Sequence, residues 1–190
     1  SSKPDAKLIV MGGDGSFNEV LNGITDFNTV TLGIVACGTG NDFIRASGHP
    51  RKVRAAIELI LRGNVGYIDY IDVGSRRCLN VAGAGMDVDV LLRYAEMKAF
   101  RGKVKYYASL FDTLAHVKWH KLRITIDGRT MDKSVFMIGV GNGTCIGGGM
   151  PICPEAKVDD GLLSVVIVNE MKKSRIPIEL PGFLTGKHIK

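Results

Sequence analysis

Residues 7–23 read KLIVMGGDGSFNEVLNG and carry a strand pattern, a glycine turn and a helix pattern in succession. The apolar run at residues 7–11 predicts a buried strand. Apolar side chains then recur at helical spacing over residues 17–24. Ser16 and Glu19 stand three residues apart, as in a capping box, so the helix is expected to begin at Ser16. A glycine turn that carries Asp14 joins the strand to the helix.

A second glycine loop, CGTGNDFIR at residues 37–45, follows another apolar run at residues 30–36. That run predicts a second strand. A helix is expected over residues 53–61, with Gly63 as its stop. Its apolar stripe consists of Val53, Ala56, Ile57, Ile60 and Leu61. The alternation of strands and helices predicts an α/β unit with parallel pairing.

The second half of the chain has a different pattern. One long helix is expected over residues 99–119, and Asp127-Gly128 predicts a type I′ hairpin turn. Further strands are expected at residues 67–73, 79–82, 122–126, 135–140 and 162–168, and a helical start at residue 176. We therefore expect two domains: an α/β nucleotide-binding domain at residues 1–68 and a β-rich, antiparallel sandwich-like domain at residues 69–190.

Composition sets the class of protein. The 190 residues are 45% hydrophobic and 23% charged, which is typical of a folded, soluble chain. No apolar run approaches the roughly 20 residues that cross a bilayer, and residues 1–5 do not resemble a secretory signal. A cytoplasmic location with peripheral membrane association is the expectation.

The net charge of +6 suits an acidic partner such as a nucleotide or an anionic lipid surface. Nucleic acid is not expected, because only 7% of residues are aromatic and no RNA-binding signature is present. The basic side chains around residues 98–123 could face a membrane, although a solvated helix surface is the simpler interpretation. The four cysteines form no C-x-x-C pair, so zinc and disulfides are not expected.

The two glycine loops point to phosphate chemistry. A glycine turn at a helix N-terminus brings backbone N–H groups close to an anion. Asp14 would repel phosphate unless a divalent cation such as Mg²⁺ bridges the two. Asp42, and either Asp69 or Asp72, could join the same ion. One such loop is equally well an ordinary turn, but two in tandem favour a site; neither matches the Walker or the dinucleotide-binding pattern.

Four blocks resemble a known family. Residues 12–23, GGDGSFNEVLNG, resemble the G-G-D-G-T-x-N-E-V-x-N-G block of the diacylglycerol kinase catalytic domain. Residues 38–45, GTGNDFIR, are similar to its G-T-G-N-D-F-A-R block. Residues 147–151, GGGMP, and 154–163, PEAKVDDGLL, look like its later G-G-G-M and P-x-A-x-x-x-D-G-x-L blocks. The bacterial soluble lipid kinases are the most similar group.

The resemblance implies a two-domain lipid kinase fold that uses ATP and Mg²⁺ to phosphorylate a lipid hydroxyl. It implies that the nucleotide is bound by Gly12, Gly13, Asp14, Gly15, Ser16, Asn18, Glu19, Gly38, Thr39 and Asn41. It assigns a carboxylate–water–Mg²⁺ network to Asp14, Asp42 and Asp69, with Asp14 as the catalytic residue. It also assigns a second, structural cation to the Asp160 carboxylate and the backbone carbonyls of Lys157 and Leu162.

The sequence departs from the family pattern in places. Ser16 replaces a threonine, and the hydroxyl is kept. The family's general base is expected in a block beyond Lys190, and the chain is interpreted as part of a longer protein. Two alternatives stay open: an NAD kinase-like enzyme, and a non-catalytic nucleotide- or lipid-binding module. A second copy of the chain, as a homodimer, stays a candidate partner.

Overall fold

The computed structural model describes residues 6–189, and the chain forms two compact units. Unit 1 comprises Ser1–Ala82, Val140–Ser164 and Phe183–Lys190, and unit 2 comprises Gly83–Gly139 and Val165–Gly182. Segments far apart in the sequence therefore share one unit. These units divide the chain differently from the expected domains, whose boundary near residue 68 stays a prediction.

Unit 1 is built on two parallel strands, β1 (Ala6–Gly12) and β2 (Val30–Ala36). Their register runs from Ala6 beside Val30 to Gly12 beside Ala36, so both strands end at the same edge of the sheet. The parallel pairing confirms the sequence expectation. Each glycine loop begins where one of these strands ends.

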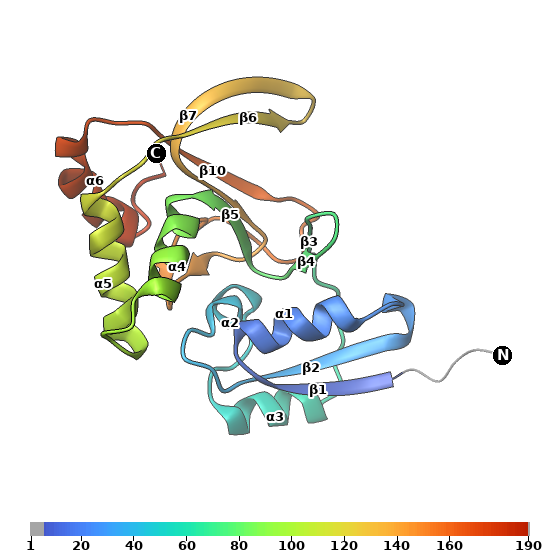
Figure 1. Ribbon diagram of the computed structural model, residues 1–190. Coiled ribbons are helices and arrows are strands. Elements are labelled where there is room, and N and C mark those ends of the chain that lie inside the picture. Colours follow the sequence, from blue (N-terminus) through green and yellow to red (C-terminus); the bar gives the residue numbers. More distant parts are fainter. Residues whose placement is uncertain (1–5, 190) are drawn as a thin grey trace. The chain divides into compact units, whose positions relative to one another are not determined.

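Three helices accompany this strand pair, namely α1 (Asp14–Gly23), α2 (Asp42–Ser47) and α3 (Val53–Leu61). Helices α1 and α3 lie on opposite faces of the pair (Figure 1). A short 3-10 turn, η1 (Phe27–Thr29), leads into β2.

Two details of these helices differ from the expectation. Helix α1 begins at Asp14 rather than Ser16; its N-cap is Gly13, which has no side chain, so the capping box does not form. In α3, Ala56 is buried, but Val53, Ile57 and Leu61 are exposed. The apolar stripe extends beyond the sheet because two strands offer only a narrow surface.

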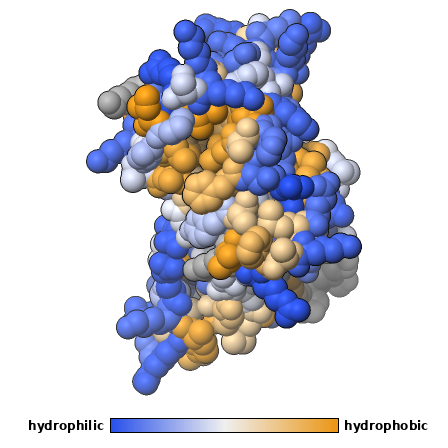
Figure 2. Space-filling model, turned by 60° about the vertical axis from the view of Figure 1, so that its left-hand side comes forward, coloured by the Kyte–Doolittle hydropathy of each residue, from blue (hydrophilic) through white to orange (hydrophobic). Residues whose placement is uncertain are grey.

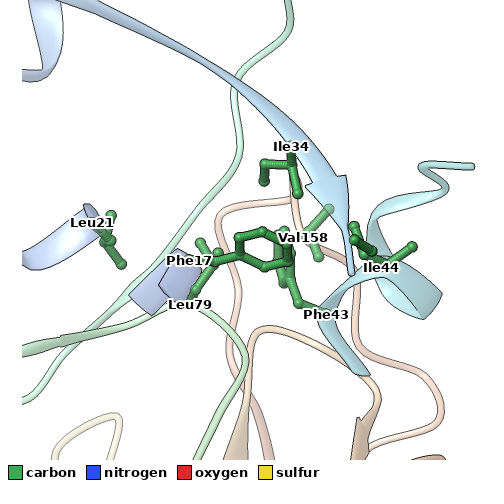
Figure 3. Close-up of a cluster of buried hydrophobic side chains, with 8 residues drawn as sticks. Phe17, Leu21, Ile34, Phe43, Ile44, Leu79 and Val158 are labelled. Atoms are coloured by element: carbon green, nitrogen blue, oxygen red, sulfur yellow. The ribbon is translucent and has the colours of Figure 1, made fainter. Parts of the chain in front are cut away.

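The core of unit 1 combines residues from four parts of the chain. Phe17, Ile34, Phe43, Leu79 and Val158 are all buried in one cluster (Figure 3). Leu79 follows the small antiparallel pair β3 (Ile71–Asp72) and β4 (Arg77–Cys78). A second small pair, β8 (Cys145–Ile146) and β9 (Met150–Pro151), lies in the same unit. These contacts explain why residues 140–164 belong to unit 1.

A four-stranded sheet with the order β10-β7-β5 dominates unit 2, and β6 pairs with β7. The strands are β5 (Val81–Gly85), β6 (His120–Ile126), β7 (Arg129–Gly141) and β10 (Ser164–Asn169). Asp127 and Gly128 join β6 to β7 with φ values of 47° and 78°. Both residues adopt the left-handed backbone conformation, which confirms the type I′ turn.

Helices α4 (Met86–Glu96) and α5 (Gly102–Ala115) also belong to unit 2. The sequence prediction missed α4 and made α5 too long, since Gly102 takes a left-handed φ of 58° that ends any continuous helix before it. Trp119 is half-buried, and the centroid of its ring lies 5.9 Å from that of Phe136. The chain continues through η2 (Lys173–Arg175) into α6 (Ile176–Leu184), which confirms the helical start at residue 176.

Candidate active site

The two glycine loops touch at the backbone. A Cβ on Gly38 would lie 2.5 Å from the Cα of Gly13, and one on Gly13 would lie 3.0 Å from the Cα of Gly38. The N–H of Cys37 donates to the carbonyl of Gly12 at 2.7 Å, which extends the strand pairing into the loops. Glycine at both positions is therefore explained by this close approach.

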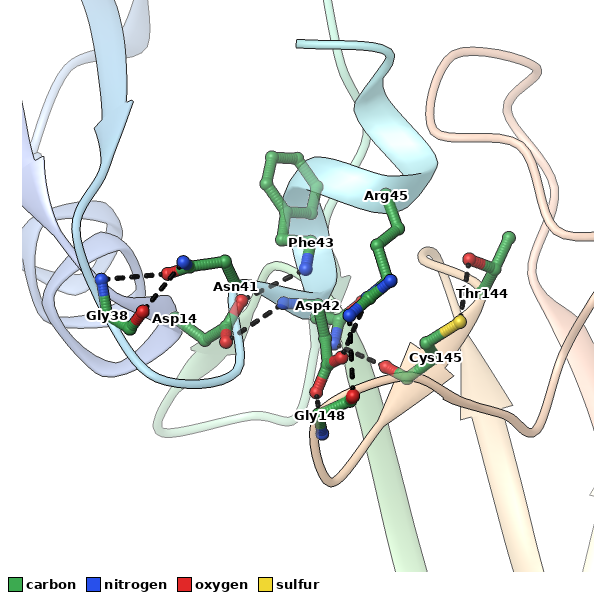
Figure 4. A network of polar contacts seen from close by, with 10 residues as sticks. Asp14, Gly38, Asn41, Asp42, Phe43, Arg45, Thr144, Cys145 and Gly148 are labelled. Carbon is green, nitrogen blue, oxygen red and sulfur yellow. Dashed lines mark hydrogen bonds and ion pairs between the residues drawn. The ribbon is translucent and has the colours of Figure 1, made fainter. Parts of the chain in front are cut away.

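Asn41 shapes the second loop from within. It adopts a left-handed φ of 51° as the N-cap of α2, a conformation that asparagine tolerates. Its Oδ1 accepts from the N–H of Gly38 at 2.9 Å, and its Nδ2 donates to the Gly38 carbonyl at 2.7 Å (Figure 4). Asn41 thus holds Gly38 in place against Gly13.

Asp14 links the first loop to the second. Its two carboxylate oxygens accept from the N–H groups of Asp42 and Phe43, each at 3.0 Å (Figure 4). Those N–H groups open α2 and have no partner inside the helix. The carboxylate therefore caps α2 from another element, in addition to any role toward a ligand.

Asp42 is buried and connects α2 to the glycine loop at residues 147–149. Its Oδ2 accepts from the N–H of Gly148 at 2.8 Å, and its Oδ1 lies 3.4 Å from the Nε of Arg45. The Nη2 of Arg45 donates in turn to the Gly148 carbonyl at 3.3 Å (Figure 4). Two of the four sequence blocks are thereby brought into direct contact.

The carboxylates of Asp14 and Asp42 converge at Gly40. A Cβ at Gly40 would lie 3.1 Å from Asp14 Oδ2 and 3.4 Å from Asp42 Oδ2. Among residues 6–189, no group of three or more His, Cys, Asp or Glu side chains could hold a metal. Two carboxylates nevertheless fit Mg²⁺, which commonly takes one or two carboxylates and completes its shell with phosphate and water.

The first turn of α1 is open. Its first helical hydrogen bond runs from Phe17 N–H to the Gly13 carbonyl, and no partner is found in the described residues for the N–H groups of Asp14, Gly15 and Ser16. A Cβ at Gly15 would meet no atom within 4 Å. Packing therefore does not explain this glycine, whereas a phosphate close to the backbone would.

The other predicted nucleotide contacts fall into two groups. Ser16, Glu19 and Thr39 are exposed, at or near the loops. Asn18 instead accepts from the N–H of Leu79 at 3.1 Å, so its carboxamide oxygen serves the packing of α1.

Asp69 lies beside the Asp160 loop. Its Oδ2 accepts from the N–H of Gly161 at 2.8 Å, while Asp160 Oδ1 accepts from the N–H of Leu162 at 3.0 Å. The structure thus brings Asp14 and Asp42 together, and places Asp69 against the loop predicted to hold the second cation. The side chains of Asp160, Lys157 and Leu162 are exposed.

Sequence reasoning missed three residues of this region. Arg45 and Gly148 lie in recognised blocks, but nothing in their spacing showed that they bind Asp42. Asn142 lies outside all four blocks, although it is completely buried and its Nδ2 donates to the Asp69 carbonyl.

Burial shifts the pKa of several titratable groups that lie outside these loops. Burial raises the pKa of Asp87 and that of Cys78, and it raises the pKa of Cys153 to about 11. All four cysteines are free. None of the helices within the described part of the chain is both long and apolar enough to span a membrane.

Two family models match the chain. Residues 2–73 match the model of the diacylglycerol kinase catalytic domain, and residues 80–190 match the YegS C-terminal NAD kinase beta sandwich-like domain. The chain belongs to the family of the YegS C-terminal NAD kinase beta sandwich-like domain, whose model covers more than half of it. Together the two matches confirm the expected fold class of an α/β domain followed by a β-rich, sandwich-like one.

Several relatives align along almost the whole chain. Diacylglycerol kinases of Staphylococcus saprophyticus and Staphylococcus aureus are each 31% identical over 185 residues, which is 96% of this chain. The alignments cover 61% and 59% of those two proteins. A crystal structure of a diacylglycerol kinase from Bacillus anthracis aligns with a TM-score of 0.72 and 30% identity, over 97% of this chain and 59% of that one. The chain therefore spans about three fifths of the length of its relatives.

Proposed function

We propose that the protein transfers the γ-phosphoryl group of ATP to the hydroxyl group of a lipid, with diacylglycerol or a related lipid as acceptor. The observation that carries the proposal is the contact between the two glycine loops, with the oxygens of Asp14 and Asp42 converging at Gly40. The names of the relatives support the lipid as acceptor.

The open first turn of α1 would receive the phosphates of ATP. Its unpaired N–H groups and the helix dipole favour an anion there. Gly15 leaves the approach free of a side chain, and the hydroxyl of Ser16 adds a donor. Gly38, held by Asn41, places Thr39 at the start of the second helix for a further contact with the nucleotide.

Asp14 and Asp42 would hold Mg²⁺, which supplies the positive charge that lets a triphosphate approach two carboxylates. Both carboxylates are fixed in advance by backbone N–H groups, from α2 in one case and Gly148 in the other. In phosphoryl transfer, catalysis comes mainly from such positioning and from charge neutralisation. Further candidates for cation binding are Asp69, Asp160 and the carbonyls of Lys157 and Leu162.

A lipid acceptor requires contact with a membrane surface, and we assign that contact to α4 and α5. Leu91, Leu92, Val104 and Phe111 are large, apolar and exposed on these helices. Figure 2 views the protein from the side that carries α4 and α5 and shows apolar side chains among polar ones there. A vesicle sedimentation assay tests the assignment: Leu91→Glu should weaken binding, whereas Leu61→Glu, on the exposed face of α3, should not.

A phosphotransfer assay with radiolabelled ATP tests the function itself. Diacylglycerol, sphingosine and ceramide in mixed micelles serve as acceptors, and NAD serves as the competing acceptor. We expect Mg²⁺-dependent label in a lipid product. Label in NAD alone would favour the alternative raised by the NAD kinase-like description of residues 80–190. ATP binding without transfer to any acceptor would favour a binding module.

A further inference from the structure

Asn142 occupies an unusual position at the end of β7. Its side chain is completely buried, with 0% of its surface exposed. Its backbone N–H donates to the carbonyl of Asn80 at 2.9 Å, and the next N–H, from Gly143, donates to the same carbonyl at 2.8 Å. The loop after β7 is therefore fastened to the segment after β4.

The side-chain amide of Asn142 joins two more segments. Its Nδ2 donates to the carbonyl of Asp69 at 2.7 Å and to the carbonyl of Leu79 at 2.9 Å. Asp69 precedes β3 and Leu79 follows β4, so one NH₂ group holds both ends of the β3–β4 hairpin. A carboxamide is well suited to this task because it presents two donors on one atom.

Asn142 adds a third hydrogen bond to those that hold Asp69. The N–H of Asp69 donates to the Val158 carbonyl at 2.6 Å, and its carboxylate accepts from the N–H of Gly161 at 2.8 Å. With the Asn142 contact to its carbonyl, Asp69 is held at its N–H, its C=O and its carboxylate. Every one of these partners lies in unit 1.

The carboxamide oxygen of Asn142 indicates that the residue is required for its two N–H donors. Asn142 Oδ1 is buried and has no hydrogen-bond partner within residues 6–189. A buried acceptor without a partner costs free energy, so asparagine is a poor choice if filling space is the only need.

We infer that Asn142 is a positioning residue that holds the Asp69 carboxylate against Gly161, in the loop predicted to hold the second cation, and thereby sets the affinity for Mg²⁺. The inference rests on the proposed function as far as Mg²⁺ is concerned. The placement of Asp69 against Gly161 is independent of it. Loss of the amide should free the Asp69 carbonyl, loosen the residue and let its carboxylate leave the Gly161 N–H.

A matched pair of variants tests this. Asn142→Ala removes the two donations to Asp69 and Leu79. Asn22→Ala removes two similar donations, to the carbonyls of Asn18 and Arg77, each at 2.7 Å, at a site without contact to Asp69. It also removes the acceptor of the Arg77 N–H at 2.8 Å, so it is the harsher of the two substitutions. Both variants should lose stability, so stability alone does not separate positioning from packing.

Hydrogen exchange gives the first readout and needs no metal. The Gly161 amide should exchange at least about tenfold faster in Asn142→Ala and at the native rate in Asn22→Ala. Unchanged Gly161 protection in Asn142→Ala would overturn the inference, whatever the protein binds. A second variant, Asn142→Ser, keeps one donor and should give an intermediate rate, which secures the test if Asn142→Ala does not fold.

Calorimetric titration with ATP at a series of Mg²⁺ concentrations gives the second readout. In Asn142→Ala the Mg²⁺ concentration for half-maximal ATP binding should rise about tenfold, and saturating Mg²⁺ should restore the affinity. Asn22→Ala should keep the native midpoint. A native midpoint in Asn142→Ala would refute the link to Mg²⁺. If the native protein binds no ATP with Mg²⁺, the proposed function fails, whereas faster Gly161 exchange would still uphold the positioning of Asp69.

Discussion

Three glycine-to-alanine substitutions separate the packing of the two loops from the binding of phosphate. In Gly38→Ala the new methyl group would lie 2.5 Å from the Cα of Gly13 and 2.8 Å from Asn41 Oδ1. Carbon atoms pack at about 3.5–4.0 Å, so the loops must move apart by about 1 Å. The obstacle is backbone and cannot rotate away. We expect the free energy of unfolding to fall by about 1–3 kcal/mol.

Gly15→Ala should behave in the opposite way. Its methyl group would meet no atom within 4 Å, and the residue lies in the first turn of α1. Alanine favours a helix over glycine by up to about 1 kcal/mol, so stability should be unchanged or higher. The methyl group would occupy the approach to the free N–H groups. Affinity for Mg·ATP should therefore fall by at least about tenfold, or about 1.4 kcal/mol.

Gly23→Ala is the control at the far end of the same helix. It also has no atom within 4 Å of the new methyl group, so it should be tolerated without affecting ATP. Urea unfolding and calorimetric titration with Mg·ATP, applied to all three variants, give the answer. Native affinity in Gly15→Ala would refute the assignment of phosphate to α1. Native stability in Gly38→Ala would refute the close contact of the loops.

Three further predictions concern individual side chains. Asp14→Asn should destabilise the protein by about 1 kcal/mol in urea unfolding, because one of the two N–H groups that open α2 loses its acceptor. Burial raises the pKa of Asp87 in the folded protein. The protonated carboxyl therefore stabilises the fold at a pH below the ordinary carboxyl pKa, and this stabilisation is lost as the pH rises through the raised pKa. Asp87→Asn should therefore raise the free energy of unfolding at pH 7 but not at pH 3, and an equal gain at both would contradict the reasoning. In thiol titration at pH 8, exposed Cys37 should react well before Cys153, which is buried and whose pKa is about 11; equal rates would count against the packing around Cys153.

Local patterns in the sequence predicted much of the fold. The apolar run before Gly12, the helical spacing after it and the Asp127-Gly128 turn each depend on neighbouring residues, and they form the expected strand, helix and turn. The expectation that the strand is buried is wrong: Leu8, Ile9 and Met11 of β1 are exposed. The start of α1 was predicted two residues late. The N-cap of α1, Gly13, lies against Gly38 of the second loop, and no local capping pattern reports such a contact.

The α/β start, the hairpin and the resemblance to a kinase family are readable from the residues alone, because short-range periodicity and four ordered blocks carry that information. How the blocks meet depends on packing between segments that are distant in the sequence. Gly148 donates to Asp42 across 106 residues, and Asn142 donates to Asp69 across 73. The sequence places no constraint on such pairings, since a hydrogen bond between distant segments forms only after packing has brought their backbones within about 3 Å.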